Sequence, residues 1–212
     1  FTVRLGEVLE SRLGNAQKAI ETYQAVLERD ASHTGALEAL ARLFEKNGEQ
    51  AKAADVLEKL LGLATGETAI ATALRLADVY GKLGDDEGIR RSLEKGLSLD
   101  ERNAEIRKRL AAVYEKTKNW GSLADLLAGD AEAAEGAPAK IALYRKAADL
   151  HLSKRSDATA AATLLEKASA LAPEDRELLL LLCDAYSASG RGKDAAEALE
   201  KIVASFGGKR SK

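Results

Sequence analysis

The side chains best suited to catalysis or metal binding are two histidines and one cysteine. His33 and His151 lie far apart, and neither has a second His four residues on or a Cys close by, so the sequence contains no zinc motif. We expect His33 to lie in a surface turn and His151 to fill a packing position. Cys183 should also be a packing residue, because a buried free cysteine behaves as a small hydrophobic side chain. The sequence therefore predicts no catalytic residue, no metal site and no cofactor.

Charge and composition narrow the class of protein further. Charged residues make up 31% of the 212 residues but nearly balance, with a net charge of −2. This argues against nucleic acid as a partner, because proteins that bind it are usually strongly basic. A single cysteine excludes an intrachain disulfide and permits a reducing compartment. No apolar run is long enough to span a membrane, so we expect a cytoplasmic protein.

The start of the chain bears on that expectation. The chain begins at Phe1 and contains no methionine. We therefore expect a fragment or a processed product, from which a targeting segment could have been lost.

An internal repeat organises the elements that would position any site. Residues 48–61, GEQAKAADVLEKLL, and residues 190–203, GRGKDAAEALEKIV, both contain Gly, then Ala-Ala five residues later, then Leu-Glu-Lys. The same frame extends over six units, each with a small residue in a first helix and a larger residue three positions on. The small residues recur every 34 to 37 positions and are Gly6, Ala41, Ala77, Ala111, Ala148 and Cys183.

This pattern resembles the tetratricopeptide repeat (TPR), a helix–turn–helix unit of about 34 residues. The resemblance covers nearly the whole chain, although the Trp typical of the family's first helix is absent from every unit. It implies an all-α, right-handed α-solenoid of six units and about twelve helices, whose first helices line a concave face. We expect the array to occupy residues 1–206, with a weak junction at 129–138 and a disordered tail at 207–212. The expected units are approximately 1–33, 34–66, 67–102, 103–137, 138–174 and 175–206.

Helix periodicity and end signals set the expected elements. Gly14, Gly48, Gly84 and Gly190 should adopt left-handed backbone at helix ends, where only glycine does so cheaply. Asn15, Asp85 and Asn119 should cap second helices. The first and fifth units carry one extra residue before the turn, within 11–14 and 153–156. The expected helices are 1–13, 16–29, 34–47, 50–62, 67–83, 86–98, 103–117, 120–133, 138–154, 158–171, 175–189 and 192–206.

Charged residues on the expected concave face form the candidate binding site. The residue that follows each small residue should face the groove. The residues two and three positions before the small residue, such as Lys146, should lie beside it. The candidate partner-binding residues are Glu7, Arg42, Arg75, Asp78, Lys108, Arg109, Arg145, Asp149 and Asp184. Two interpretations stay open: ordinary charge alternation on exposed helices, or a mixed-charge groove that recognises an extended segment with acidic side chains. Glu7, Arg42 and Asp78 stand where chaperone-binding relatives have Asn, so we expect no chaperone-tail clamp.

The leading hypothesis for function is a protein–protein interaction scaffold, not an enzyme, that binds a peptide or protein segment in its concave groove. One alternative is a structural spacer or assembly segment of a longer TPR array in a bacterial envelope or motility complex. Another is a regulatory or docking segment of a larger enzyme. The first unit should also expose an apolar end face with Val3, Val8 and Leu13, which predicts association into a homo-oligomer.

Overall fold

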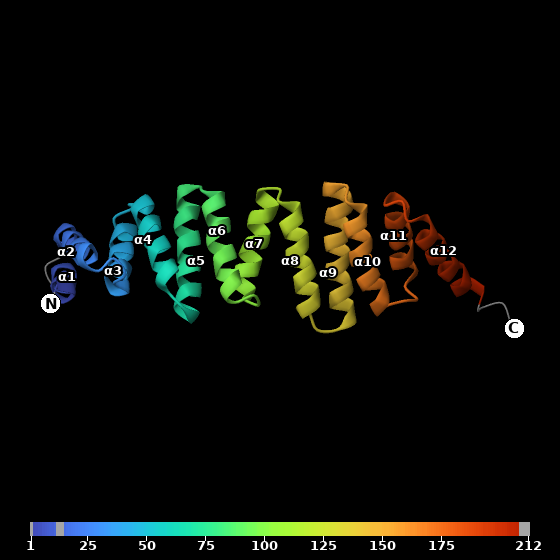
Figure 1. The fold of residues 1–212 in the computed structure, drawn as a ribbon, viewed down its shortest axis with the longest axis horizontal. Helices are drawn as coiled ribbons and strands as arrows, with labels where there is room; N and C mark the ends of the chain where they lie inside the picture. The colour runs from blue at the N-terminus through green and yellow to red at the C-terminus, as the bar shows by residue number, and fades with distance from the viewer. Residues whose placement is uncertain (1, 12–14, 208–212) are drawn as a thin grey trace. The chain divides into compact units, whose positions relative to one another are not determined.

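The structure is a computed structural model that describes residues 2–11 and 15–207. Twelve α-helices and no strand occur in these ranges, which confirms the predicted all-α solenoid of helix–turn–helix units (Figure 1). The helices are α1 (Thr2–Ser11), α2 (Ala16–Arg29), α3 (Thr34–Lys46), α4 (Gln50–Leu63), α5 (Gly66–Leu83), α6 (Asp86–Leu99), α7 (Ala104–Lys116), α8 (Trp120–Ala133), α9 (Ala137–Leu150), α10 (Ala158–Leu171), α11 (Arg176–Ala188) and α12 (Gly192–Gly207). A π-helical turn, η1 (His151–Arg155), follows α9.

The helices divide into two compact units, Phe1–Val113 and Tyr114–Lys212. The division falls within α7, and the expected weak junction at 129–138 lies inside the second unit. Within each unit, successive helices pack side by side along the chain (Figure 1). Most of the expected tail, residues 208–212, lies outside the described residues.

Apolar stripes on the helices supply the core of each unit. In the first unit, Leu37, Leu40 and Phe44 are buried at helical spacing on α3, and they share one cluster with Leu57 and Leu60 of α4. Burying side chains of this size contributes about 1.5–3 kcal/mol each. In the second unit, the equivalent apolar residues of α10 and α11 are buried as well, and so is Cys183. The repeat frame therefore marks the packing face of each helix.

The small residues of the repeat frame let neighbouring helices approach closely. Gly6 shows this most directly, because a Cβ added there would lie 2.6 Å from Cζ of the Tyr23 ring. Ala41, Ala77 and Ala148 are buried at the equivalent positions of later first helices. A larger side chain at these positions would push adjacent helices apart.

The first helices α3, α5 and α11 end in the same way before their second helices begin. Gly48, Gly84 and Gly190 have φ angles of 77°, 70° and 76°, as predicted, whereas Gly14 lies outside the described residues. The next residue begins the second helix, and its N–H donates to the carbonyl five residues earlier, as from Asp85 to Tyr80 at 3.0 Å. This bond satisfies a carbonyl that the end of the first helix would leave unpaired.

Side-chain caps start the second helices at the predicted residues. Asn15, Asp85 and Asn119 accept from the backbone N–H three residues on, at 3.1, 2.9 and 3.4 Å. Asp157 does the same for α10 at 3.0 Å and was not among the predicted caps. A cap of this kind stabilises a helix by about 1 kcal/mol.

The extra residue of the fifth helix–turn–helix repeat is accommodated by η1. The sequence predicts one helix over 138–154, but the α-helix ends at Leu150 and the backbone widens into a π-helical turn. The N–H of Asp157 then donates to the carbonyl six residues earlier, of His151, at 2.9 Å. In the first helix–turn–helix repeat, the N–H of Asn15 likewise donates to the carbonyl of Leu9, also six residues earlier, at 3.0 Å. The bond that joins the two helices is therefore kept with either loop length.

Candidate partner-binding face

The odd-numbered helices carry the predicted charged residues. We use the term first-helix face for the surface formed by α1, α3, α5 and α7 in the first unit, and separately for that formed by α9 and α11 in the second. Arg42, Asp78, Asp149 and Asp184 each follow a small residue and are exposed there, as is Lys108. The side chain of Glu7 lies outside the described part of the chain.

In the first unit, the predicted arginines pair with acidic residues of the preceding first helix. Arg42 on α3 makes two hydrogen bonds to the Glu10 carboxylate on α1, at 2.5 and 2.8 Å. Arg109 on α7 donates to Asp78 on α5 and, at 3.3 Å, to the backbone carbonyl of Leu74. We call the pairs that join consecutive first helices of this unit the ion-pair ladder.

Arg75 forms the middle step of the ion-pair ladder. Its guanidinium on α5 donates to Glu38 at 2.5 Å and to Glu45 at 2.7 Å, both on α3. Burial alone would lower the pKa of Arg75, but the two carboxylates outweigh this effect and raise it. The three arginines of the ion-pair ladder, Arg42, Arg75 and Arg109, are therefore already paired with carboxylates of this chain.

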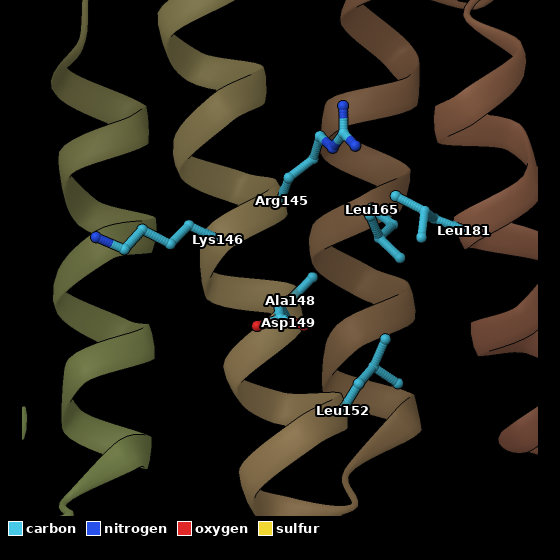
Figure 2. A pocket seen from close by; sticks show the side chains of 7 residues that line it. All are labelled: Arg145, Lys146, Ala148, Asp149, Leu152, Leu165 and Leu181. Carbon is cyan, nitrogen blue, oxygen red and sulfur yellow. The ribbon is translucent and has the colours of Figure 1, made fainter.

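In the second unit, a pocket of about 340 Å³ opens between α9 and α11 (Figure 2). We call it the α9–α11 pocket. Its apolar lining comes from Ala148, Leu152, Leu165 and Leu181, and its charged lining comes from Arg145, Lys146 and Asp149. A volume of this size lies at the lower end of the usual range for ligand sites, so it suits a side chain or a short segment.

The charges around the α9–α11 pocket are only partly paired. Arg145 donates to Glu177 on α11 at 2.5 Å. In Figure 2 the amine of Lys146 points to the opposite side of α9 from Leu165 and Leu181. Among the residues that the structure describes, Asp149 and Asp184 have no ion-pair partner. The pocket thus combines an apolar floor with an exposed, unpaired carboxylate at its rim.

Sequence analysis named the charged residues that line this pocket as groove candidates, but it gave the apolar lining no part in binding. It named Arg145, Lys146 and Asp149, but it treated Leu165 as a packing residue of its second helix and assigned no role to Leu152 or Leu181. The repeat frame does contain a signal for Leu181, which stands two residues before the small residue Cys183. At the same position, two residues before the small residue, α5 carries Arg75 and α7 carries Arg109. A leucine at a position otherwise held by arginine marks a break in the charge pattern.

A tyrosine–glutamate contact recurs on both units, away from the pocket. The Tyr80 hydroxyl donates to Glu58, and the Tyr186 hydroxyl donates to Glu166 at 3.0 Å. Burial first, and then the adjacent carboxylate, raise the pKa of each tyrosine to about 12. These contacts tie a first helix to the second helix before it, so they are part of the scaffold.

His151 takes the place of an aromatic residue in the fifth unit and is buried. Its Nδ1 lies 3.2 Å from the Arg155 guanidinium and 3.8 Å from the Asp157 carboxylate. Burial first, and then the charge of Arg155, lower the pKa of His151. His33 caps α3, where its Nδ1 accepts from the Ala36 N–H at 3.2 Å. Neither histidine lines the α9–α11 pocket, and the described residues contain no cluster of three or more potential metal ligands.

The outer helices of the array expose apolar side chains. Leu5 and Val8 on α1 are 51% and 41% exposed, whereas Leu13 and the side chain of Val3 lie outside the described part. On α12, Val203 and Phe206 are 68% and 60% exposed. None of the described helices is long and apolar enough to cross a membrane.

Paired helices in a repeated frame define an α-solenoid repeat protein. Family models described as "Tetratricopeptide repeat" match residues 9–68 and 152–209. The chain belongs to the tetratricopeptide repeat family. Proteins of this family are generally non-catalytic scaffolds, and their fold is associated with protein or peptide partners.

Known proteins resemble the chain at low identity. Cellulose synthase 2 operon protein C of Komagataeibacter xylinus is 31% identical over 107 residues, which is half of this chain but only 8% of that protein. The Naa15 and Naa10 complex bound to HypK-THB shares the fold with a TM-score of 0.57 and 15% identity, over 95% of this chain and 30% of that one. YrrB, described as a TPR protein with an unusual peptide-binding site, aligns with a TM-score of 0.46 and 19% identity over 88% and 90% of the two chains.

Proposed function

We propose that this chain is a non-catalytic interaction scaffold that binds a segment of a partner protein on the first-helix face of its second unit. The single observation that supports this most strongly is the α9–α11 pocket, with three leucines below a charged rim. Apolar lining provides affinity, and a few placed polar groups provide orientation, which is the usual composition of a ligand site. The ion-pair ladder of the first unit leaves fewer free charges for a partner.

A pair of neighbouring leucines allows a sharp test. Leu181 lines the pocket, whereas Leu180 is 50% exposed and does not line it. Peptides would be selected from a random display library on the immobilised chain and then measured by fluorescence anisotropy. Leu181→Trp should fill the pocket and weaken the selected peptides by at least about tenfold, which corresponds to about 1.4 kcal/mol. Leu180→Trp should leave their affinity unchanged.

The folding of both variants would be compared by circular dichroism and thermal unfolding. Equal peptide affinity for Leu181→Trp and the natural chain would rule out the α9–α11 pocket as the binding site. Failure to enrich any peptide would argue against a peptide-binding scaffold altogether.

A second candidate function is an assembly segment of a longer array, for instance in a bacterial envelope complex. Two observations favour it: the similarity to one short part of Cellulose synthase 2 operon protein C, and the exposed apolar residues of α1 and α12. Apolar end faces of repeat arrays favour stacking on another unit. Light scattering over a concentration series should then detect dimers that Val203→Lys abolishes. A monomer at high concentration would contradict this candidate.

A further inference from the structure

We infer that the α9–α11 pocket binds an arginine side chain of the partner protein, in the place that Arg109 occupies in the first unit. The inference rests on the proposed function and adds the chemistry of the ligand. It depends on one position of the repeat frame, which differs between the two units.

The first unit shows how an arginine fills the space between two first helices. Arg109 stands two residues before the small residue of α7, and Asp78 stands one residue after the small residue of α5. The Arg109 guanidinium donates to the Asp78 carboxylate and to the carbonyl of Leu74, three residues before the same small residue of α5. One planar guanidinium can serve both acceptors, because it presents several N–H groups in a fixed fork.

The second unit repeats the acceptors without the arginine. Asp149 stands one residue after Ala148, and Arg145, with its own backbone carbonyl, stands three residues before it. The position equivalent to Arg109 is occupied by Leu181. Leucine cannot donate a hydrogen bond and is shorter than arginine, and the α9–α11 pocket opens beside it.

The charge that faces the pocket is complementary to a cation. Arg145 is neutralised by Glu177, and Lys146 points to the other side of α9 (Figure 2). Lys146 and Asp149 are the two charged lining residues without an ion-pair partner among the described residues, and because the Lys146 amine points away, Asp149 supplies the unpaired charge at the rim. The three leucines of the pocket suit the methylene stem of an arginine, since long basic side chains cover apolar surface with their stems and keep the charged group at a polar edge.

The volume of the pocket indicates that the arginine belongs to an extended segment of another protein. About 340 Å³ holds one long side chain and not a folded element. The pocket lies on the surface between two helices, so the backbone of the segment would pass along the first-helix face outside it. A second copy of this chain as the source of the arginine would appear as self-association that Asp149→Asn removes.

Three matched pentapeptides provide the test, each acetylated and amidated, with a central residue between alanines. The central residue is arginine, its neutral isostere citrulline, or glutamate. We expect the arginine peptide to shift the amide resonances of Asp149 and Leu181 saturably in NMR titrations. The citrulline peptide should bind at least about tenfold more weakly, because a charge-assisted hydrogen bond is lost.

Variants of the chain complete the test. Leu181→Arg should place an arginine next to Asp149 within the chain and abolish binding of the arginine peptide, whereas Leu180→Arg should not. Asp149→Asn should weaken the arginine peptide by at least about tenfold with little change in the citrulline peptide. If Leu181→Arg fails to fold, Asp149→Asn decides the result, since the Asp149 side chain is exposed and makes no hydrogen bond or ion pair within the described residues.

Several results would overturn the inference. These are tighter binding of the glutamate peptide, equal binding of the arginine and citrulline peptides, no saturable shift with any peptide, or an unchanged affinity in Asp149→Asn. The proposed function can survive each of them. Selected library peptides without arginine that still lose affinity for Leu181→Trp would keep the pocket as a binding site and exclude arginine as its ligand.

Discussion

The first-helix faces of the two units share one repeat frame but differ in how their charged side chains are paired. In the first unit, Arg42, Arg75 and Arg109 join consecutive first helices through carboxylates of the chain itself. In the second unit, the described residues show one such link, from Arg145 on α9 to Glu177 on α11, and an apolar pocket lies beside it. The same repeat frame therefore carries a face whose arginines are paired with carboxylates of the chain and another on which the Asp149 carboxylate has no ion-pair partner among the described residues.

The difference teaches that the charge pairing of a first-helix face depends on single positions of the repeat frame and not on the pairing of its helices. Exposed ion pairs contribute little to stability, about 0.2–1 kcal/mol each, so a unit loses little by giving one up. A position such as that of Leu181 can then change from arginine to leucine without endangering the fold. Under the proposed function, the unpaired Asp149 carboxylate and the space beside Leu181 would form a site at small cost in stability.

The largest expected effect concerns the leucines below the two faces. Leu57 and Leu165 hold the same frame position and are buried, with 0% and 1% exposure, but only Leu165 lines the α9–α11 pocket. Both alanine substitutions should destabilise the chain by about 2–5 kcal/mol. Leu165→Ala should lie at the low end, because its cavity opens to the pocket and water can enter. Native-state hydrogen exchange in each unit would measure both losses.

Hydrogen exchange is chosen because repeat arrays need not unfold in a single step. If Leu165→Ala lost more unfolding free energy than Leu57→Ala, the cavity at Leu165 would not be open to water through the α9–α11 pocket, and the proposed difference between the two faces would be contradicted.

A smaller effect should be equal in the two units. Tyr80→Phe and Tyr186→Phe each remove one hydrogen bond to a glutamate, which should cost about 1 kcal/mol. The pKa of both tyrosines is raised from 10 to about 12, so the folded chain holds these protons more tightly than the unfolded chain. Their contribution is fully present below pH 10 and is lost as the pH rises from 10 to 12. Alkaline titration of tyrosinate absorbance in the natural chain and the two Phe variants would test this.

Unequal titration of Tyr80 and Tyr186 would show that the units differ in their scaffold as well as in their faces. The remaining tyrosines serve as internal controls, since neither Phe variant should alter them.

The smallest change in stability should come from the reciprocal exchange, Arg109→Leu. It removes the step of the ladder between α5 and α7 and copies the arrangement around Leu181. The free energy of unfolding should fall by less than about 1 kcal/mol, and a double-mutant cycle with Asp78→Asn should give a coupling of about 0.2–1 kcal/mol. The variant should also gain weak binding of the arginine pentapeptide, detected by NMR at Asp78. Stability loss without any gain of binding would indicate that the second-unit pocket needs features beyond this one position.

Most of the fold follows from the sequence because the same signals recur six times. Small residues such as Gly6 and Ala148, turn glycines such as Gly48, and caps such as Asp85 all agree with one frame, so errors in any one unit are corrected by the others. The predicted helix over 138–154 was wrong at its end, because the spacing of apolar residues does not show that one extra residue converts the last turn into a π-helical turn.

The candidate site follows from the sequence only in part. The placement of Arg75 and Arg109 on first helices could be expected from the frame, but their pairing with Glu45 and Asp78 depends on distances between helices that are far apart along the chain. The role of Leu152 and Leu181 depends on space left between packed helices, which no residue pattern measures. The charge pattern can therefore identify an exposed face from the sequence, but a pocket on that face is found only in the structure.

The bond between Asp157 and His151 has a consequence for how this chain can vary in length. It spans six residues, whereas the equivalent bond from Asp85 to Tyr80 spans five, yet both second helices begin with a side-chain cap. An insertion or deletion of one residue at this turn is absorbed by η1 and does not shift the phase of the helices that follow. The end of a first helix is therefore a place where such an array can gain or lose residues in evolution, or accept an engineered loop, while every later unit keeps its register.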